Sequence, residues 1–451
     1  MKVVIVGAGI TGLSLAHELL KLGHGVTLVE AAPRPGGELA TVEVGGEPVE
    51  RFYHHLFTHD SFMIGLAEEL GVGDRLEWPE PEMGYYLGGR LYPFTSPLDL
   101  LKFGALSPWA RLRLGLGSVL LQRRRDYGPF EDRTAAEVLP RYVGREAFEA
   151  IFASMLRAKF AGHWESVSMA WMWARLMARA RTRTADKRRE RLGYFRGSFR
   201  VIVDALADSV RGRGAALRLA SPVQEITIGE PGAPALRVND EPVEADAVVA
   251  TVGLPIIRRL LPASQRGFTD SLAATAYVGA CVALIQIREQ LSRYYWTNIG
   301  DRDLPFAGLI EHTNYVDRER YGGKRLLYVS NYLPPEHEFF QVDDDVLIER
   351  FVDPIAKVFP TFRREHIEEA WVSRDPVAQP VIEAGYQRRK PPYASPIPGF
   401  YICNTSQIYP EDRGTNYNVR IAKECAAQLD ADAPTLLARR SNGTDVTACS
   451  T

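Results

Sequence analysis

The chain has 451 residues, of which 46% are hydrophobic, and a formal net charge of −2. This length allows two or three domains with a large core, and the nearly balanced charge argues against nucleic acid as a partner. The four cysteines are scattered and form no CxxC pair, so no metal site is expected and a reduced, cytoplasmic protein is the simplest interpretation. The sequence suggests neither a signal peptide before the first strand nor an apolar run near the roughly 20 residues of a membrane span.

The N-terminal residues predict a nucleotide-binding strand, turn and helix. An apolar run over residues 3–6 is typical of a buried parallel strand. Gly7, Gly9 and Gly12 follow at GxGxxG spacing, before a helical pattern over residues 13–20. The first glycine permits a tight turn, the second lets a pyrophosphate approach the backbone, and the third lets the helix pack closely on the strand. The phosphates are then expected at the helix N-terminus.

A second strand is predicted over residues 26–29, and Glu30 ends it. A carboxylate at this place accepts hydrogen bonds from a ribose diol and repels a 2′-phosphate, so an adenine dinucleotide other than NADP is expected. Arg34, Gly36 and Gly37 follow at a distance from which a loop can return to the phosphates, which favours FAD over NAD. With this pattern the chain resembles the flavoprotein superfamily of amine oxidases, protoporphyrinogen oxidases, carotenoid desaturases and UDP-galactopyranose mutases. In that superfamily the glycine doublet belongs to an extended FAD fingerprint.

The resemblance implies further contacts with FAD from two later parts of the chain. Residues 223–226 and 245–251 predict two strands that return to the nucleotide domain. In the superfamily the first of these lies against the adenine, which makes Val223 a candidate. Residues 398–404 predict another strand, and residues 414–426 a helix that follows it. The superfamily uses this end of the chain around the ribityl chain and the flavin ring, and the matching candidates are Asn404, Asp412, Asn416 and Tyr417.

The chain departs from the superfamily pattern at two of these places. Glu38 follows the glycine doublet, where the family usually has a basic residue. Asn404 and Ser406 replace the usual glycine and acid at the end of the last strand, and Asp412 is the candidate substitute for that acid. No second GxGxxG follows a strand, so no site for a pyridine nucleotide is predicted and the electrons are expected to come from the substrate.

The histidine-rich segment over residues 52–60 leaves the nucleotide domain where the chain of the superfamily passes the flavin ring. Its stretch His55, Leu56 and Phe57 resembles the aromatic and histidine residues of the mutases. An imidazole there could hydrogen-bond to the flavin or bias its protonation, which makes His55 the leading catalytic candidate. The alternative is that His54 and His55 are core histidines bonded to backbone carbonyls.

Residues 294–300, 305–314 and 326–330 also resemble the mutases. They combine aromatic and β-branched residues with glycine breaks, which predicts antiparallel strands of a substrate sheet. Glu311 on one of these strands is a second catalytic candidate, which either faces a pocket or is satisfied within the sheet.

Tyr386 and Tyr417 are candidates for the two walls of an aromatic cage like that of amine oxidases, with Trp371 close to the first wall in the sequence. Such a cage guides a neutral amine or stacks a ring, but tyrosines at these places could equally belong to the core. No cysteine occupies the turn at Tyr386, where some amine oxidases attach their flavin. FAD is therefore expected to be bound non-covalently.

Residues 171–200 are strongly basic and carry apolar side chains at helical spacing. A helix of this kind could lie on an anionic membrane or bind a phosphate-bearing substrate. It could also be a solvated face over a core stripe. Peripheral membrane contact and a homodimer are both left open. Residues 193–199 resemble the family's turn into a helix that packs on the FAD domain.

Together these patterns predict an α/β fold, in which a substrate domain of mixed β-sheet and helices is inserted into a discontinuous Rossmann-type FAD-binding domain. The expected parts are FAD-binding residues 1–75, 196–265 and 386–437, a helical substrate region over 76–195, a substrate sheet over 266–385, and a flexible tail over 438–451.

The predicted function is an FAD-dependent oxidoreductase, an oxidase or dehydrogenase. It would remove a hydride from a C–N or C–C bond of a small-molecule substrate and pass the electrons to O2 or another acceptor. One alternative is a redox-neutral, flavin-dependent mutase or isomerase of a nucleotide sugar. The regions of His55 and Glu311 favour it, but no pair of diphosphate-binding arginines is evident. A flavin-bearing binding protein without turnover is the third interpretation.

Overall fold

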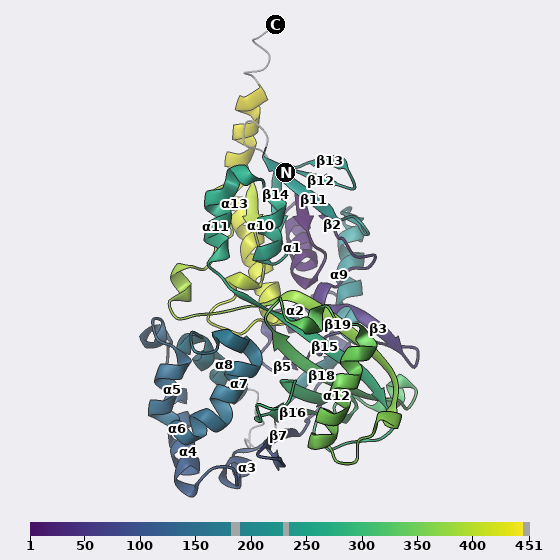
Figure 1. Cartoon of the computed structure of the whole chain (residues 1–451). Coiled ribbons are helices and arrows are strands. Elements are labelled where there is room, and N and C mark those ends of the chain that lie inside the picture. Colours follow the sequence, from purple (N-terminus) through teal and green to yellow (C-terminus); the bar gives the residue numbers. More distant parts are fainter. Residues whose placement is uncertain (182–189, 229–233, 445–451) are drawn as a thin grey trace.

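A computed structural model gives the fold of residues 1–181, 190–228 and 234–444 (Figure 1). One unit is built on a parallel sheet of β1 (Lys2–Val6), β2 (Gly25–Val29), β10 (Ala216–Arg218), β14 (Ala247–Ala250) and β20 (Phe400–Ile402). The strand order is β10-β2-β1-β14-β20, and every neighbouring pair is parallel. The strands come from three separate stretches of the chain, so the discontinuous Rossmann-type domain expected from the sequence is confirmed.

Helices and a small sheet cover both faces of this parallel sheet. The helices are α1 (Ile10–Lys21), α9 (Arg200–Gly212), α10 (Leu254–Leu260), α11 (Arg266–Ala273) and α13 (Thr415–Thr444). Val3 and Ile5 of β1 belong to the core cluster that contains α1, whereas Val4 and Val6 belong to the cluster that contains α10. Because both faces are covered, β14, β20 and β1 after its first residue are continuous apolar runs, as in other parallel sheets.

The small sheet beside it is antiparallel and consists of β11 (Val223–Ile228), β12 (Pro234–Val238) and β13 (Glu241–Glu244). The strand expected over residues 223–226 therefore exists, but it pairs with β12, and β10 is the strand that pairs with β2. Polar and apolar residues alternate in β11, which suits a sheet with one solvated face. Asn239 and Asp240 both have positive φ, and they make the tight turn between β12 and β13.

The substrate region contains a seven-stranded mixed sheet. Its strands are β7 (Met83–Leu87), β8 (Arg90–Pro93), β15 (Tyr277–Ile287), β16 (Trp296–Ile299), β17 (Gly308–Glu311), β18 (Arg325–Leu333) and β19 (Ile367–Pro380). The order is β19-β15-β18-β17-β16-β7-β8, and only β16 and β7 pair in parallel. The antiparallel strands β16, β17 and β18 confirm the expectation from the sequence, whereas β15 and β19 were not predicted.

This mixed sheet lies between the FAD-binding unit and helix α12 (Asp344–Val358). On one face of β15, Val282 and Leu284 belong to the same core cluster as β1 and α1. On the other face, Ala283 and Ile285 pack in the cluster that contains α12. All residues of β15 are buried because both faces are covered.

Residues 97–181 form a helical region at the lower end of the molecule in Figure 1. Its helices are α3 (Pro97–Leu101), α4 (Pro108–Gln122), α5 (Ala135–Val143), α6 (Arg145–Ala147), α7 (Ser154–Phe160) and α8 (Met169–Arg181). Helix α8 begins the basic stretch noted in the sequence, and its Trp171 and Met172 are completely buried in the core. Across the described ranges, no helix has the length and apolar character needed to cross a bilayer.

Helix α2 (Ser61–Glu69) and short strands connect these units. The strands are β3 (Thr41–Val44) with β4 (Glu47–Glu50), and β5 (Leu56–Phe57) and β6 (Leu76–Glu77) on either side of β9 (Leu192–Phe195). As expected, the segment after β9 turns into α9, which packs against α1. Helix α13 continues to Thr444, into the segment expected as a flexible tail. The remaining tail residues, and residues 182–189 of the basic stretch, lie outside the described part.

Glu50, at the end of β4, joins the FAD-binding unit to the substrate sheet. Its carboxylate accepts hydrogen bonds from the Tyr194 hydroxyl at 2.7 Å and from the Phe199 N–H at 2.5 Å. Its backbone carbonyl accepts a hydrogen bond from the hydroxyl of Tyr328, on β18, at 2.5 Å. Burial raises the pKa of Glu50 to about 7, against the lowering effect of Tyr194 and Phe199. The folded protein therefore holds a proton on this carboxyl that the unfolded chain would release.

We expect the free energy of unfolding to fall as the pH rises from about 4.5 to about 7, because the unfolded chain loses the Glu50 proton first. The contribution is complete below the unfolded pKa and is lost once the folded pKa is passed, and it amounts to at most about 3 kcal/mol. Glu50→Gln should remove this slope. Urea denaturation of both proteins between about pH 4 and pH 8 measures it, and equal slopes would show that Glu50 does not titrate as described.

Candidate active site

The three glycines at the start of α1 have different structural roles. Gly7 has a φ of 104°, and a Cβ on it would lie 2.7 Å from the Thr251 Oγ1 atom. A Cβ on Gly12 would lie 2.0 Å from the Gly7 carbonyl oxygen, so α1 can pack here only with glycine. A Cβ on Gly9 would have its nearest protein neighbour, Gly37, at 3.8 Å. The fold itself does not need glycine at position 9, where the motif keeps room for a pyrophosphate.

The second glycine loop lies directly against this turn. Gly36 forms an isolated parallel bridge with Gly9, and its N–H donates to the Ala8 carbonyl at 2.9 Å. Gly36 and Gly37 have φ values of 135° and 58°, which favour glycine. Helix α1 has no side-chain cap at its N-terminus, so the amides of its first turn can bind an anion. Arg34 is exposed on the same loop, two residues before Gly36.

Glu30 lies at the carboxyl end of β2, next to the same turn. Its two carboxylate oxygens accept hydrogen bonds from the N–H groups of Ala8 and Ala32, both at 2.8 Å. The Ser221 N–H donates to the Glu30 carbonyl at 2.8 Å, which brings the start of β11 to this edge of the sheet. Val223 begins β11 and is half-buried. Glu30 and Val223 therefore lie at the same edge of the parallel sheet. Their contacts with the ribose and the adenine of FAD stay predictions.

Asn404 follows β20 at the carboxyl edge of the parallel sheet. Its Nδ2 atom donates to the Val252 carbonyl at 2.7 Å, and its Oδ1 atom accepts from the N–H and hydroxyl of Ser406 at 3.0 and 2.6 Å. Val252 follows Thr251, whose hydroxyl donates to the Val6 carbonyl at 2.8 Å. The side chain of Asn404 therefore fixes a loop beside the glycine turn.

Helix α13 begins close to α2 and carries two more of the predicted residues. The Asn416 Oδ1 atom accepts hydrogen bonds from the N–H groups of Phe62 and Met63, at 2.9 and 3.1 Å, so that Asn416 caps helix α2. The Tyr417 ring packs against the Arg420 guanidinium, which lies 5.0 Å from its centroid. Burial raises the pKa of the Tyr417 phenol, which is therefore neutral.

His55 lies among aromatic side chains of the substrate region. Its ring packs edge-on against Phe57, Tyr295 and Trp296, and its Nδ1 atom is 3.3 Å from the Tyr295 hydroxyl. Burial lowers the pKa of His55 to about 3, with a smaller contribution from the Arg179 guanidinium, so the imidazole is neutral at physiological pH. The ring is nevertheless only half-buried.

His54 has a different environment from His55. Its Nδ1 atom donates to the Phe52 carbonyl at 2.6 Å, and its ring packs against Phe199. Burial lowers the pKa of His54 to about 4, and Arg413 lowers it further against the raising effect of the Phe52 carbonyl. This bond to a backbone carbonyl matches the interpretation of His54 as a core histidine.

A partly buried group of charges, which no sequence motif indicated, lies between the helical region and α13. The Asp412 carboxylate pairs with the Lys159 ammonium at 3.0 Å and also with Arg175. Burial alone would raise the pKa of Asp412, but these cations hold it below its usual value. The Lys159 ammonium also lies 5.3 Å from the ring centroid of Tyr332. Asp412, predicted to contact the flavin, is thus engaged by two cations.

Arg413 compensates for the acid at position 38. Its guanidinium donates to the Glu38 carboxylate at 2.5 Å, to the Gln379 Oε1 atom at 2.9 Å and to the Tyr332 hydroxyl at 3.4 Å. Burial alone would lower the pKa of Arg413, but Glu38 and Tyr332 raise it above its usual value. A cation therefore lies next to the glycine doublet although residue 38 is acidic. Glu38 stands where the family usually has a basic residue. This exchange was the one feature of the sequence that could have indicated a compensating cation elsewhere in the chain.

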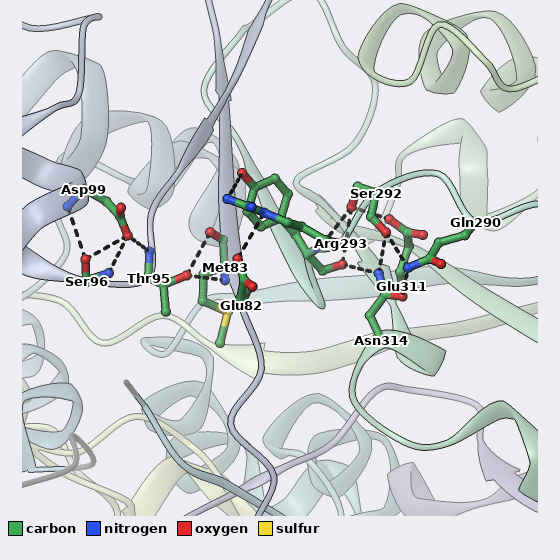
Figure 2. Close-up of polar contacts among 11 residues, drawn as sticks. Glu82, Met83, Thr95, Ser96, Asp99, Gln290, Ser292, Arg293, Glu311 and Asn314 are labelled. Carbon is green, nitrogen blue, oxygen red and sulfur yellow. Dashed lines mark hydrogen bonds and ion pairs between the residues drawn. The ribbon is translucent and has the colours of Figure 1, made fainter. Parts of the chain in front are cut away.

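Glu311 holds the loop that precedes β16, and Figure 2 shows its carboxylate pointing toward Ser292. Its Oε1 atom accepts a hydrogen bond from the Ser292 hydroxyl at 2.5 Å, and its Oε2 atom accepts one from the Leu291 N–H at 3.0 Å. Asn314 donates to the carbonyls of Ser292 and Tyr294 in the same loop. Burial raises the pKa of Glu311, against the lowering effect of its donors. These contacts match the alternative in which Glu311 is satisfied within the sheet region.

Tyr386 and Tyr417, the two predicted cage walls, have unlike surroundings. Tyr386 is only 1% exposed, its hydroxyl donates to the Ser406 carbonyl at 2.8 Å, and its ring packs against Tyr409. The ring of Tyr417 instead packs against Arg420. The environment of Tyr386 is that of a core tyrosine.

A family model described as "Flavin containing amine oxidoreductase" matches residues 10–411. The chain belongs to this flavin-containing amine oxidoreductase family. Membership makes it an FAD-dependent oxidoreductase, and the residues at the first turn of α1 fit that cofactor. Gly9 leaves room beside the backbone, the amides of α1 have no side-chain cap, and Glu30 lies where a ribose can be bound.

Relatives within this family agree with the superfamily expected from the sequence. The 15-cis-phytoene desaturase of Glycine max is 24% identical over 440 residues, which cover 91% of this chain and 76% of the desaturase. The protoporphyrinogen oxidase of Nicotiana tabacum is 31% identical over 169 residues, which cover 37% of this chain and 30% of the oxidase. The structure of a reduced UDP-galactopyranose mutase has a TM-score of 0.73 at 18% identity and 95% coverage of both chains, and this similarity shows a shared fold.

Two glycine substitutions separate binding of the cofactor from folding. We expect Gly9→Ala to fold with nearly the thermal stability of the flavin-free wild type but to lose FAD, because its Cβ meets no close protein atom and fills the space for the pyrophosphate. Gly12→Ala is the matched control and should unfold at a clearly lower temperature, because its Cβ would overlap the Gly7 carbonyl. Visible spectra give the flavin content, and melting curves of the flavin-free proteins give the stability. A Gly9→Ala protein with full flavin content would refute the assignment.

Proposed function

We propose that this oxidoreductase is a dehydrogenase that introduces a double bond into an apolar small molecule. It would remove a hydride from a C–C unit of the substrate and pass the electrons to O2 or another acceptor. The observation that carries the proposal is the aromatic wall around His55. The phytoene desaturase that matches most of this chain gives independent support.

The rings in direct contact with His55 carry no charge at neutral pH, although the Arg179 guanidinium lies near enough to lower the pKa of the imidazole. The pKa of His55 is lowered to about 3 by burial, and burial raises the pKa of the Tyr295 phenol. Phe57 and Trp296 complete the contacts of the imidazole. Aromatic faces of this kind suit a flat or chain-like hydrocarbon, which loses little on leaving water. Oxidation of an amine is less favoured, because Tyr386 has the surroundings of a core residue.

Each part of the chain then has a defined task. The amides of α1, Gly9, Gly36 and Glu30 would bind the pyrophosphate and ribose of FAD. When bound, FAD supplies the redox chemistry by taking the hydride, while the second hydrogen of the substrate leaves as a proton. With a pKa of about 3, His55 is too weak a base to hold that proton at neutral pH. We therefore assign His55 to positioning, together with the Tyr295 hydroxyl.

The flavin is proposed to be bound without a covalent link. Cys281, Cys403 and Cys425 are all at most 1% exposed, which leaves these thiols no surface for attachment to a ring. At the turn where some amine oxidases attach the cofactor, this chain has Tyr386.

The second candidate is a redox-neutral mutase or isomerase of a nucleotide sugar. Lys159, Arg175 and Arg413 favour it, because guanidinium and ammonium groups bind diphosphates. Against it, Asp412 and Glu38 already pair with these three cations.

A reduction experiment without oxygen separates these functions. The oxidised flavoprotein is mixed anaerobically with phytoene in detergent micelles, with cyclohexylamine, and, after chemical reduction, with UDP-galactopyranose. We expect only the polyene to bleach the visible flavin absorbance, because the rings that contact His55 are aromatic and uncharged. Bleaching by the amine alone, or isomerisation of the sugar by the reduced protein, would overturn the proposal.

His55→Ala tests the residue that defines the wall. It should retain FAD and slow the bleaching by about 10²-fold if the imidazole positions the substrate. The rate of the wild type should not follow a histidine titration between about pH 5 and pH 9, since His55 stays neutral there. His54→Ala is the control, because His54 bonds to a backbone carbonyl and should affect thermal stability more than the rate.

A further inference from the structure

One surface of the helical region is strongly apolar although it faces solvent. Among the described residues, ten large hydrophobic side chains are strongly exposed, and seven of these ten lie between residues 98 and 120. These seven, with exposed fractions from 47% to 70%, are Leu98, Leu101, Trp109, Leu112, Leu116, Val119 and Leu120. We call them the α3–α4 face. This concentration on two neighbouring helices differs from the single exposed apolar residues found on most protein surfaces.

Helix α4 is apolar on two sides, and only one side serves the fold. Its buried side contains Ala110, Leu114 and Leu121. Gly117 lies on the same side, where a Cβ would be 2.4 Å from the Tyr142 carbonyl, so α4 packs tightly on α5 there. The exposed residues at positions 109, 112, 116 and 119 recur in steps of three and four, and therefore form a second stripe. The core does not account for this second stripe.

Both helices are fixed at their N-termini, so the face is presented by an ordered structure. Ser96 and Asp99 form a capping box at the start of α3, and Figure 2 shows the two side chains in contact. Ser107 caps α4 by accepting a hydrogen bond from the Ala110 N–H at 3.2 Å. The N–H and hydroxyl of Ser107 in turn donate to Glu146, at 2.5 and 2.7 Å.

Cations predominate along this face, although Asp99 lies in α3 and Glu146 bonds to the cap of α4. Residues 100–125 contain no acid and six cations, namely Lys102, Arg111, Arg113, Arg123, Arg124 and Arg125. Within the described structure, Arg111 donates to the Leu101 carbonyl and Arg124 to the Tyr142 hydroxyl, at 2.5 and 3.3 Å. Arg113 donates to the carbonyls of residues 140 and 141. These bonds use neutral oxygens, and residues 100–125 keep a net positive charge.

We propose that the α3–α4 face binds the surface of an anionic lipid bilayer. The leucines and Val119 would enter the boundary between headgroups and acyl chains, Trp109 would lie at the interface, and the arginines would contact lipid phosphates. A second copy of the chain is a poorer partner, because a two-fold contact would bring two positive faces together. The proposal rests on this surface alone and does not depend on the substrate.

For the basic stretch that begins at Trp171, membrane contact was one of three interpretations, beside a phosphate-bearing substrate and a solvated face over a core stripe. In this stretch, helix α8 buries its apolar stripe in the core. The α3–α4 face keeps its apolar side chains free of the core, and it lies in the helical region, at the opposite end of the molecule from the N-terminus (Figure 1).

Vesicle flotation with the flavin-loaded, full-length protein tests the proposal. The vesicles contain phosphatidylcholine alone or phosphatidylcholine mixed with phosphatidylglycerol. We expect the wild type to float with the mixed vesicles and to be released by high salt. Leu112→Ser/Leu116→Ser should bind on the order of tenfold more weakly, because two apolar anchors are lost. Arg123→Gln/Arg125→Gln should bind the mixed vesicles on the order of tenfold more weakly, with little change on phosphatidylcholine.

Leu22→Ser/Val346→Ser is the matched control, because these side chains are similarly exposed, at 47% and 45%, but lie outside the face. It should float like the wild type. Failure of the wild type to bind the mixed vesicles at low salt would overturn the proposal, as would equal binding by the Leu112→Ser/Leu116→Ser protein. Size-exclusion chromatography with light scattering tests whether the α3–α4 face instead joins two copies of the chain. A wild-type dimer that becomes monomeric in the leucine variant, without vesicle binding, would show that the face joins two copies.

Discussion

The contact of Gly9 with the turn at Gly36 and Gly37 is the constraint on which the cofactor site depends. It brings two loops from successive β-strands together at the N-terminus of α1. Gly12 sets the position of that helix, because its lack of a side chain lets α1 pack against the Gly7 carbonyl. Glu30 and Asn404 then attach the ends of β2 and β20 to the same edge of the sheet.

The second feature of the site is a set of buried charges that connects remote segments. Glu38 follows the glycine doublet, Arg413 precedes α13, and their ion pair joins the two ends of the FAD-binding unit. Asp412 extends this link to Lys159 and Arg175 in the helical region. Buried charges are costly unless they are paired, so each partner holds the others in place. The substrate region is thereby fixed to the cofactor side by electrostatics, and by Glu50 through hydrogen bonds.

Local patterns in the sequence were enough to predict the nucleotide-binding half of the fold. The glycine motif, Glu30 and the Gly36–Gly37 doublet lie within one supersecondary unit, where spacing alone carries the information. Strand β15 was missed because all of its residues are buried and nearly all are apolar, and such a run has no alternation that distinguishes it from a helix. Arg413 was missed because its partner, Glu38, is remote in the sequence and only the fold brings them together.

Helices α4 and α8 show a second limit of prediction from the sequence, because the pattern of a helix does not tell which of its apolar stripes is buried. Both α4 and α8 carry apolar stripes and arginines, and the sequence pattern raised membrane contact only for the stretch that contains α8, as one alternative to a solvated face over a core stripe. The elements that pack on each helix decide which of its apolar stripes is covered. Trp171 of α8 is completely buried, whereas Trp109 of α4 is 70% exposed. Among the candidate site residues, His55 and Glu311 looked alike as polar groups near aromatic strands. Their contacts separate them, because Glu311 is engaged by Ser292 and Leu291 while His55 remains half-buried among rings.

The most direct test of this account is a crystal structure of the purified flavoprotein in its oxidised form. We expect electron density for the pyrophosphate of FAD at the N-terminus of α1, in contact with Gly9 and the Gly36–Gly37 turn. The ribose should contact Glu30, and the flavin ring should lie on the side of the chain that carries His55. Density for the pyrophosphate away from Gly9, or for the ring on the opposite side from residues 52–57, would contradict the account.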